Sequence, residues 1–80
     1  MTFSTVAQLE DALRQIAGAD AEPASMTVDY GAAAADEASA SKAWIERSTR
    51  SLVFAQAELR TEDGNLVAAA SAVFRRVTQP

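Results

Sequence analysis

Hydrophobic positions near the start of the chain follow the period of an α-helix. In residues 4–17 an apolar stripe recurs at spacings of three, four and three residues, and it consists of Val6, Leu9, Leu13 and Ile16. This spacing predicts an amphipathic helix that buries one face. Thr5 and Gln8 fit a capping box at its start. Gly18 fits its end, because glycine adopts positive φ at no steric cost.

The pattern changes after the helix. Residues 18–25 contain Pro23, which lacks an amide hydrogen, and they are interpreted as a connection. Residues 26–34 begin with strict alternation of apolar and polar side chains, which predicts a strand. The polar stretch "DEASAS" at 36–41 fits either a turn or a continuation of that strand past a bulge at Gly31.

Three further alternating segments complete the chain, at 41–48, 51–60 and 66–77. The last two flank "TEDGN" at 61–65, whose Asp-Gly pair is a strong hairpin signal. The order is therefore one helix and then four strands joined by short turns. We expect residues 1–80 to form a single α+β domain, with the N-terminal helix packed on a four-stranded antiparallel sheet.

One helix covers only one face of such a sheet. The last strand places Leu66, Phe74 and the alanines between them on one face, and Val67, Val73 and Val77 on the other. A chain of 80 residues without cysteine has no disulfide to offset its small core. The uncovered apolar surface therefore predicts a homodimer or a higher homo-oligomer. Trp44 is expected in the core, and a subunit interface is the alternative place for it.

Composition excludes several kinds of chemistry. The chain has no histidine and no cysteine, so the ordinary catalytic triads and the usual zinc sites are not available. We expect no cofactor and no metal. The net charge of −4 disfavours nucleic acid as a partner. No segment fits a signal peptide or a membrane span, so we expect a cytoplasmic protein with no membrane partner.

Charge is unevenly distributed along the chain. Residues 1–40 carry seven acidic side chains and one arginine, whereas residues 41–80 carry six basic and four acidic side chains. A local anion site is therefore possible in the C-terminal half. The simpler interpretation is that these charges are solvated strand ends and loops.

The segment "AWIERSTRSLVFAQAELRTEDGNLVAAASAVF", and most sharply "FAQAELRTEDGNLVAAASAVF", resembles the C-terminal half of hotdog-fold thioesterases. It is most similar to the phenylacetate-degradation and 4-hydroxybenzoyl-CoA thioesterase type. The resemblance covers about half of the chain. It implies a helix wrapped by a curved antiparallel sheet, subunits paired sheet to sheet, and an acyl-CoA ligand at the subunit boundary. The family has a strand and a His-Gly-Gly stretch before the helix. Here only "MTF" precedes it, which implies a hotdog shortened at the N-terminus.

Thioester hydrolysis needs a carboxylate that attacks the acyl carbon or activates a water. The resemblance implies that Asp11, the closer match to the family's helix aspartate, has this role. The simpler interpretation is a solvated polar face, with Glu10 paired to Arg14. The resemblance also implies that Arg47 and Arg50 lie near the CoA phosphates, which suit the planar guanidinium group.

Other polar candidates have simpler interpretations. Arg47 and Arg50 lie in the polar segment "ERSTRS", and a turn between two strands requires polar residues. The simpler interpretation is therefore that the two arginines belong to a solvated turn. Arg75 and Arg76 follow the last apolar run and are interpreted as gatekeepers of a sheet end. Asp29 and Tyr30 are not a catalytic pair, because adjacent strand residues point to opposite faces.

Two functions remain open from the sequence. The first is a small hotdog protein of the acyl-CoA thioesterase type that binds or hydrolyses an acyl thioester. The second is a non-catalytic dimerising or ligand-binding module that has lost the hotdog active site. A cone-shaped domain like that of ketosteroid isomerase is a third possibility for the fold, but it normally needs more helices than this chain supplies.

Overall fold

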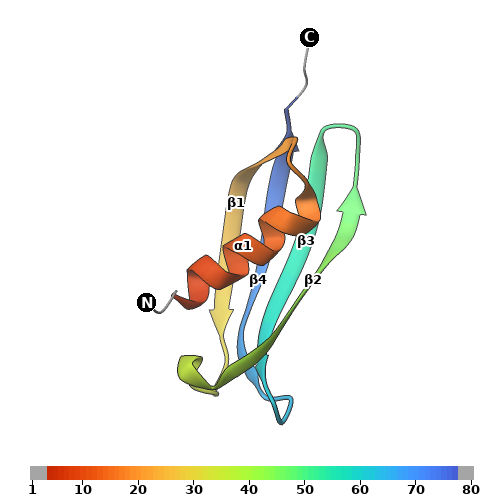
Figure 1. Cartoon of the computed structure of the whole chain (residues 1–80). Coiled ribbons are helices and arrows are strands. Elements are labelled where there is room, and N and C mark those ends of the chain that lie inside the picture. Colours follow the sequence, from red (N-terminus) through yellow and green to blue (C-terminus); the bar gives the residue numbers. More distant parts are fainter. Residues whose placement is uncertain (1–3, 78–80) are drawn as a thin grey trace.

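The computed structural model describes residues 4–77 of the chain. One helix lies across one face of a four-stranded antiparallel sheet, and the sheet curls around it (Figure 1). The strand order is β1-β4-β3-β2. The elements in chain order are α1 (Thr5–Ala17), β1 (Ala21–Tyr30), the 3-10 helix η1 (Ala35–Glu37), β2 (Ala38–Ser48), β3 (Leu52–Thr61) and β4 (Leu66–Arg76). The predicted fold class is confirmed. The predicted shortening of the hotdog at the N-terminus concerns residues 1–3, which lie outside the described residues.

The start of α1 differs from the prediction. Ser4 is the N-cap, and its Oγ accepts a hydrogen bond from the Ala7 backbone N–H at 3.0 Å. The capping box predicted for Thr5 and Gln8 is therefore wrong by one residue. The N-cap hydroxyl accepts from the amide three residues ahead, and that pair is Ser4 and Ala7. At the other end Gly18 has φ +101°, which L side chains rarely adopt, so it ends the helix as expected.

The buried side of α1 consists of Leu9, Leu13 and Ala17. Ile16, which the periodic stripe included, is 39% exposed. The helix therefore meets the sheet through a stripe that ends at the small Ala17. A small residue at this point lets the last turn of the helix approach the strands closely.

Strand β1 begins five residues earlier than predicted. The expected connection at 18–25 is wrong from Ala21 onward, because β1 is an edge strand and an edge tolerates the missing amide hydrogen of Pro23. The pairing with β4 shifts register between Pro23 and Ser25. The strand also ends earlier than predicted, at Tyr30, and the polar stretch that follows contains a 3-10 turn rather than a simple continuation of the strand.

The β3–β4 hairpin was predicted correctly and forms the centre of the sheet. Gly64 has φ +89°, and its N–H donates to the Thr61 carbonyl oxygen at 2.9 Å. The Thr61 hydroxyl accepts from the Asn65 N–H at 3.1 Å. Arg60 donates to the Gly64 carbonyl oxygen at 2.9 Å, so the turn is held by both backbone and side-chain bonds.

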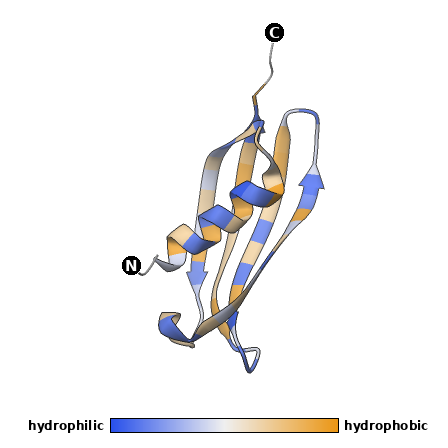
Figure 2. Ribbon diagram, in the orientation of Figure 1, coloured by the Kyte–Doolittle hydropathy of each residue, from blue (hydrophilic) through white to orange (hydrophobic). Residues whose placement is uncertain are grey.

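The core lies between α1 and the sheet. Alternate residues of β3 and β4 point toward the helix, and the alternation appears as bands along the strands in Figure 2. Most of these residues are alanines, which allow the helix to pack closely. The larger buried side chains at the core are Leu9, Leu13, Val53, Leu59 and Phe74, each no more than 2% exposed. Burial of each large side chain stabilises the fold by about 1.5–3 kcal/mol.

The opposite side of the sheet, which we call the open face, carries no helix (Figure 1). The prediction that Val67 lies there uncovered is wrong, because Val67 is 2% exposed. The register with β3 shifts beside it, so Arg60 pairs with Leu66 and Leu59 with Ala68. This bulge leaves Val67 and Ala68 both buried. The open face is therefore less apolar than strict alternation implied.

Candidate functional site

Asp11 lies on the outer surface of α1. Its side chain is exposed, and its Oδ2 accepts a hydrogen bond from Gln15 Nε2 at 2.8 Å. The neighbouring Glu10 pairs with Arg14 at 2.8 Å, as the spacing of four residues predicted. Asp11 lines a shallow depression of about 220 Å³ together with Ala7, Glu10 and Arg14. A carboxylate in this position is accessible to a ligand or to another protein.

Arg47 lies near the end of β2 and Arg50 lies in the β2–β3 connection, and both are exposed. The prediction that both lie in a turn between strands is therefore wrong for Arg47, because that residue pairs with Phe54 in the sheet. Within residues 4–77 neither side chain has a hydrogen bond or an ion pair. Thr49 shapes the turn, because its N–H donates to the Leu52 carbonyl oxygen at 2.8 Å and its hydroxyl accepts from the Leu52 N–H at 3.0 Å. Arg50 thus lies on an ordered turn and Arg47 on the strand that leads into it, and both side chains are open to solvent.

The sequence missed a structural role for Arg76. Its Nε donates to the Thr49 carbonyl oxygen at 3.2 Å, and its Nη2 donates to the Ser48 hydroxyl at 2.6 Å. Asp20 lies 3.9 Å away. Arg76 therefore links the end of β4 to the β2–β3 connection. Arg75 points to solvent and reaches Glu22 at 3.5 Å. The sequence indicated that two adjacent arginines lie at a strand end. The contact of Arg76 with the β2–β3 connection could be seen only once the strand order was known.

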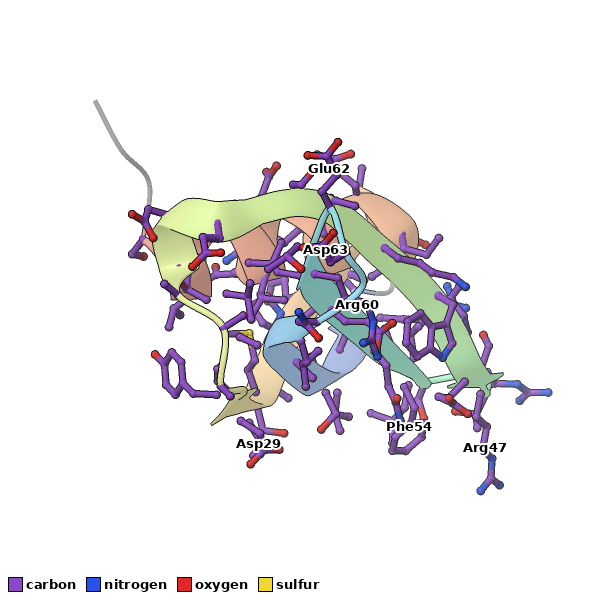
Figure 3. All side chains as sticks on the ribbon, turned by 90° about the horizontal axis from the view of Figure 1, so that it is seen from below. Asp29, Arg47, Phe54, Arg60, Glu62 and Asp63 are labelled. Atoms are coloured by element: carbon purple, nitrogen blue, oxygen red, sulfur yellow. The ribbon has the colours of Figure 1, made fainter. Side chains whose placement is uncertain are left out.

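The structure does not bring the predicted site residues together within one chain. Arg47 pairs with Phe54 across the sheet, and both point away from the helix (Figure 3). Asp11 is exposed on the helix, which covers the other face. A ligand that contacted both residues of one chain would have to pass around the edge of the sheet.

Trp44 also lies on the open face, so the prediction that it fills the core is wrong. It pairs with Gln56 across the sheet and is half-buried. Its indole N–H donates to the Glu46 carboxylate at 2.8 Å, and the Lys42 ammonium lies 5.7 Å from the centre of the ring. Its place follows from the register of β2, which directs Ala43 and Ile45 to the helix side.

A hollow of about 360 Å³ lies on the open face. Its polar lining comes from Ser25, Thr27, Glu46, Gln56 and Ser71, and its apolar lining includes Phe54 and Val73. The size is sufficient for a small organic group or for a protein side chain.

Glu58 and Arg60 form an ion pair on the open face. Arg60 donates two hydrogen bonds to the Glu58 carboxylate, at 3.1 and 3.2 Å. These hydrogen bonds hold the pKa of Glu58 below its ordinary value. Glu58 is therefore a poor general base, because its charged form is stabilised.

Among residues 4–77, no group of three or more acidic side chains is arranged to hold a metal ion. A search of the same residues for a helix that could span a bilayer found none.

Comparison with protein families identifies the kind of domain. The family model for the acyl-CoA thioesterase N-terminal domain matches residues 4–75. The chain belongs to this family. The match spans the helix, the four strands up to residue 75 and the connections between them, and it includes Asp11, Arg47 and Arg50. The predicted membership of the hotdog thioesterase superfamily is confirmed. Searches of curated proteins and of solved structures each gave no match.

Proposed function

We propose that this thioesterase-family domain binds an acyl-CoA thioester and hydrolyses it, and that it acts as a homo-oligomer. The observation that carries the proposal is the family match over residues 4–75. It is supported by an accessible helix carboxylate and by two exposed arginines, one near the end of β2 and one in the β2–β3 connection, since a carboxylate suits thioester hydrolysis and guanidinium groups suit the CoA phosphates.

Asp11 is proposed as the catalytic residue. A carboxylate exposed on a helix can activate a water for attack on the acyl carbon, or can attack that carbon itself. The Gln15 amide donates to Asp11 at 2.8 Å and thereby fixes the orientation of its carboxylate. Since the shallow depression beside Asp11 encloses little of a ligand, a second subunit is proposed to cover it.

Arg47 and Arg50 are proposed to bind the phosphates of CoA. Both are exposed and without ion pairs within the described residues, so phosphate binding does not compete with an existing partner. Since Arg47 and Asp11 lie on opposite sides of the sheet, we propose that the two parts of one acyl-CoA contact different subunits.

A non-catalytic module that binds CoA or only dimerises is the second candidate. The isolated position of Asp11, whose single described hydrogen-bond partner is Gln15, favours it. The absence of histidine also favours it, because no imidazole is available to assist proton transfer. Binding of CoA without turnover distinguishes this candidate from the enzyme.

The test is thioester hydrolysis with short, long and aromatic acyl-CoA substrates. For an enzyme we expect Asp11→Asn to lower kcat/KM by about 100-fold or more, the usual effect of a lost general base. Glu10→Gln is the matched control, because Glu10 is adjacent and its partner is Arg14, and it should retain activity. An unchanged kcat/KM in Asp11→Asn would exclude the proposed catalytic role of Asp11.

Binding of free CoA tests the arginines separately. Arg50→Ala should weaken binding by about tenfold, as expected for one lost charge-assisted contact. Arg75→Ala removes the same charge at the end of β4, from a side chain that the proposed contacts do not use, and should have no effect. Equal affinities for the two variants would contradict the phosphate contact.

The cytoplasmic location also stays a prediction, and fractionation of cells that express the tagged chain tests it.

A further inference from the structure

The hollow on the open face, of about 360 Å³, is lined by residues of all four strands. Phe54 and Val73 form its apolar part. Phe54 pairs with Val73 on one side and with Arg47 on the other. Figure 3 shows that Phe54 and Arg47 both point away from the helix. The hollow therefore adjoins the arginine that the proposed function assigns to the phosphates of CoA.

Several polar side chains of the hollow are available to a ligand. Thr27, Ser71 and Gln56 pair in a row across β1, β4 and β3. Within residues 4–77 none of these three side chains has a hydrogen bond to the protein. A hydroxyl donates and accepts, and an amide offers one acceptor oxygen and two donor hydrogens. The row therefore presents both donors and acceptors beside the apolar part of the hollow.

A bulge in β2 adds a carboxylate to the hollow. The pairing with β3 shifts register before Arg47, so Glu46 and Arg47 together oppose Phe54. One oxygen of Glu46 accepts from the Trp44 indole N–H at 2.8 Å, which fixes the orientation of the carboxylate. The other oxygen has no hydrogen bond within residues 4–77. Because a carboxylate accepts and does not donate, this side of the hollow favours an amino group over a carbonyl.

We propose that the hollow binds the adenosine part of CoA, with the base stacked on Phe54 and the phosphates directed toward Arg47. The inference rests on the proposed function and gives one part of its ligand a place. Adenine is flat, and its edge carries an amino group between two acceptor nitrogens. The Gln56 amide matches the amino group and one ring nitrogen, and Glu46 accepts from the second hydrogen of the amino group.

The position of Arg47 fits the shape of this ligand. Neighbouring strands lie about 5 Å apart, so a base on Phe54 directs its ribose toward β2 and its 5′-diphosphate within reach of Arg47. The exposed arginine can donate two parallel hydrogen bonds to a phosphate. All of these residues belong to one chain, so the adenosine site does not depend on self-association.

The other parts of an acyl-CoA suit the hollow less well. An acyl group has no donor for Glu46 and no partner for the Gln56 amide, and polar groups that are removed from water without a partner are unfavourable. The pantetheine arm has amide groups but no flat ring to stack on Phe54. Stacking on an aromatic side chain is a main source of affinity for a base.

Two nucleotides that differ at one edge of the base test the proposal. Adenosine 5′-diphosphate (ADP) contains the base, ribose and diphosphate of CoA, and inosine 5′-diphosphate (IDP) has a carbonyl in place of the amino group. Trp44 is the only tryptophan of the chain and donates to Glu46, so its fluorescence reports binding at the hollow. Titration of the full chain should give a saturable change with ADP. IDP should have a dissociation constant about tenfold higher, because its carbonyl oxygen faces the carboxylate.

Three variants separate this contact from a general effect on the fold. Glu46→Gln should bring the two dissociation constants to about the same value, because an amide can also donate to the carbonyl of IDP. Glu62→Gln removes the same charge from the exposed 61–65 turn and should keep the preference for ADP. Phe54→Leu keeps an apolar side chain but removes the ring, and it should weaken both nucleotides about tenfold. Circular dichroism should show that this variant stays folded.

Four results would overturn the proposal: no saturable change with ADP, equal dissociation constants for ADP and IDP in the unmodified chain, a preference for ADP that survives Glu46→Gln, or phosphopantetheine binding that depends on Phe54 in place of ADP binding. The test also separates this inference from the proposed function. Binding of CoA that depends on Arg50 without a preference for ADP would refute the adenosine site alone. Binding of ADP in the hollow without acyl-CoA turnover would refute only hydrolysis.

Discussion

Replacement of Gly31 by alanine tests how tightly the end of β1 is fitted against the start of β4. The Gly31 N–H donates to the Val67 carbonyl oxygen at 2.8 Å, and the Ala33 N–H donates to the Leu66 carbonyl oxygen at 3.2 Å. A Cβ added at Gly31 would lie 2.2 Å from that Leu66 oxygen and 2.8 Å from its carbonyl carbon. Both neighbours are backbone atoms, so no flexible side chain can move aside.

The size of the effect follows from the distances. Ordinary contact requires about 3.4 Å, so the two segments must separate by roughly 1 Å, which lengthens both hydrogen bonds beyond useful range. Two lost bonds cost about 2 kcal/mol, and residual crowding adds about 1 kcal/mol. The lower entropy of an unfolded alanine offsets about 0.4–1 kcal/mol of this. We therefore expect Gly31→Ala to lower the free energy of unfolding by about 2 kcal/mol, which is a fall in Tm of about 8–16 °C for a domain of this size.

Thermal unfolding followed by circular dichroism measures this change, and Gly64→Ala is the matched control. Gly64 has φ +89° and no atom within 4 Å of an added Cβ, so only the backbone conformation is penalised. That penalty is about 1–2 kcal/mol before the same entropic offset. Gly31→Ala should therefore be the less stable variant. If it is as stable as Gly64→Ala, the close approach of the two strands is refuted.

Three further predictions concern caps, connections and charge. Ser4→Ala should lower the free energy of unfolding by about 1 kcal/mol, because it removes the N-cap of α1, and an unchanged Tm would contradict this. Arg76→Ala should speed amide hydrogen exchange in the connection around Thr49 without affecting the 61–65 turn, and equal exchange in both turns would argue against the link. Since the pKa of Glu58 is lowered in the folded state, its contribution to stability is present above the ordinary glutamate pKa of about 4.3 and is lost as pH falls through the lowered value. Arg60→Ala should raise the pKa of Glu58 in an NMR titration, and an unchanged pKa would show that another group causes the shift.

Local sequence patterns predicted the two central strands well, because β3 and β4 are consecutive in the chain and a short turn joins them. The alternation in residues 52–61 and 66–76 lies on either side of an Asp-Gly turn, which fixes which residues face each other. The edge strand β1 was misplaced for the opposite reason. A proline such as Pro23 is not tolerated in a central strand but is tolerated in an edge strand. The local sequence does not show that β1 lies at the edge, because that depends on the strand order.

The faces to which single side chains point were predicted less well than the strands. Strict alternation placed Val67 on the open face, but the bulge beside it turns that side chain inward. Trp44 was assigned to the core by its size, whereas its place in β2 directs it to the open face. Of the candidate site, the exposure of Asp11 followed from the helical wheel. The separation of Asp11 from Arg47 by the sheet required the three-dimensional structure.

The central claim is that acyl-CoA binds to the surfaces that carry Asp11, Arg47 and Arg50. Backbone amide chemical shifts of the labelled chain, recorded while an acyl-CoA is added, test it most directly. Binding there predicts shifts at the end of β2 around Arg47, in the β2–β3 connection around Arg50 and along the exposed side of α1 around Asp11, with saturation at increasing ligand. An unchanged spectrum, or shifts confined to the 61–65 turn, would contradict it.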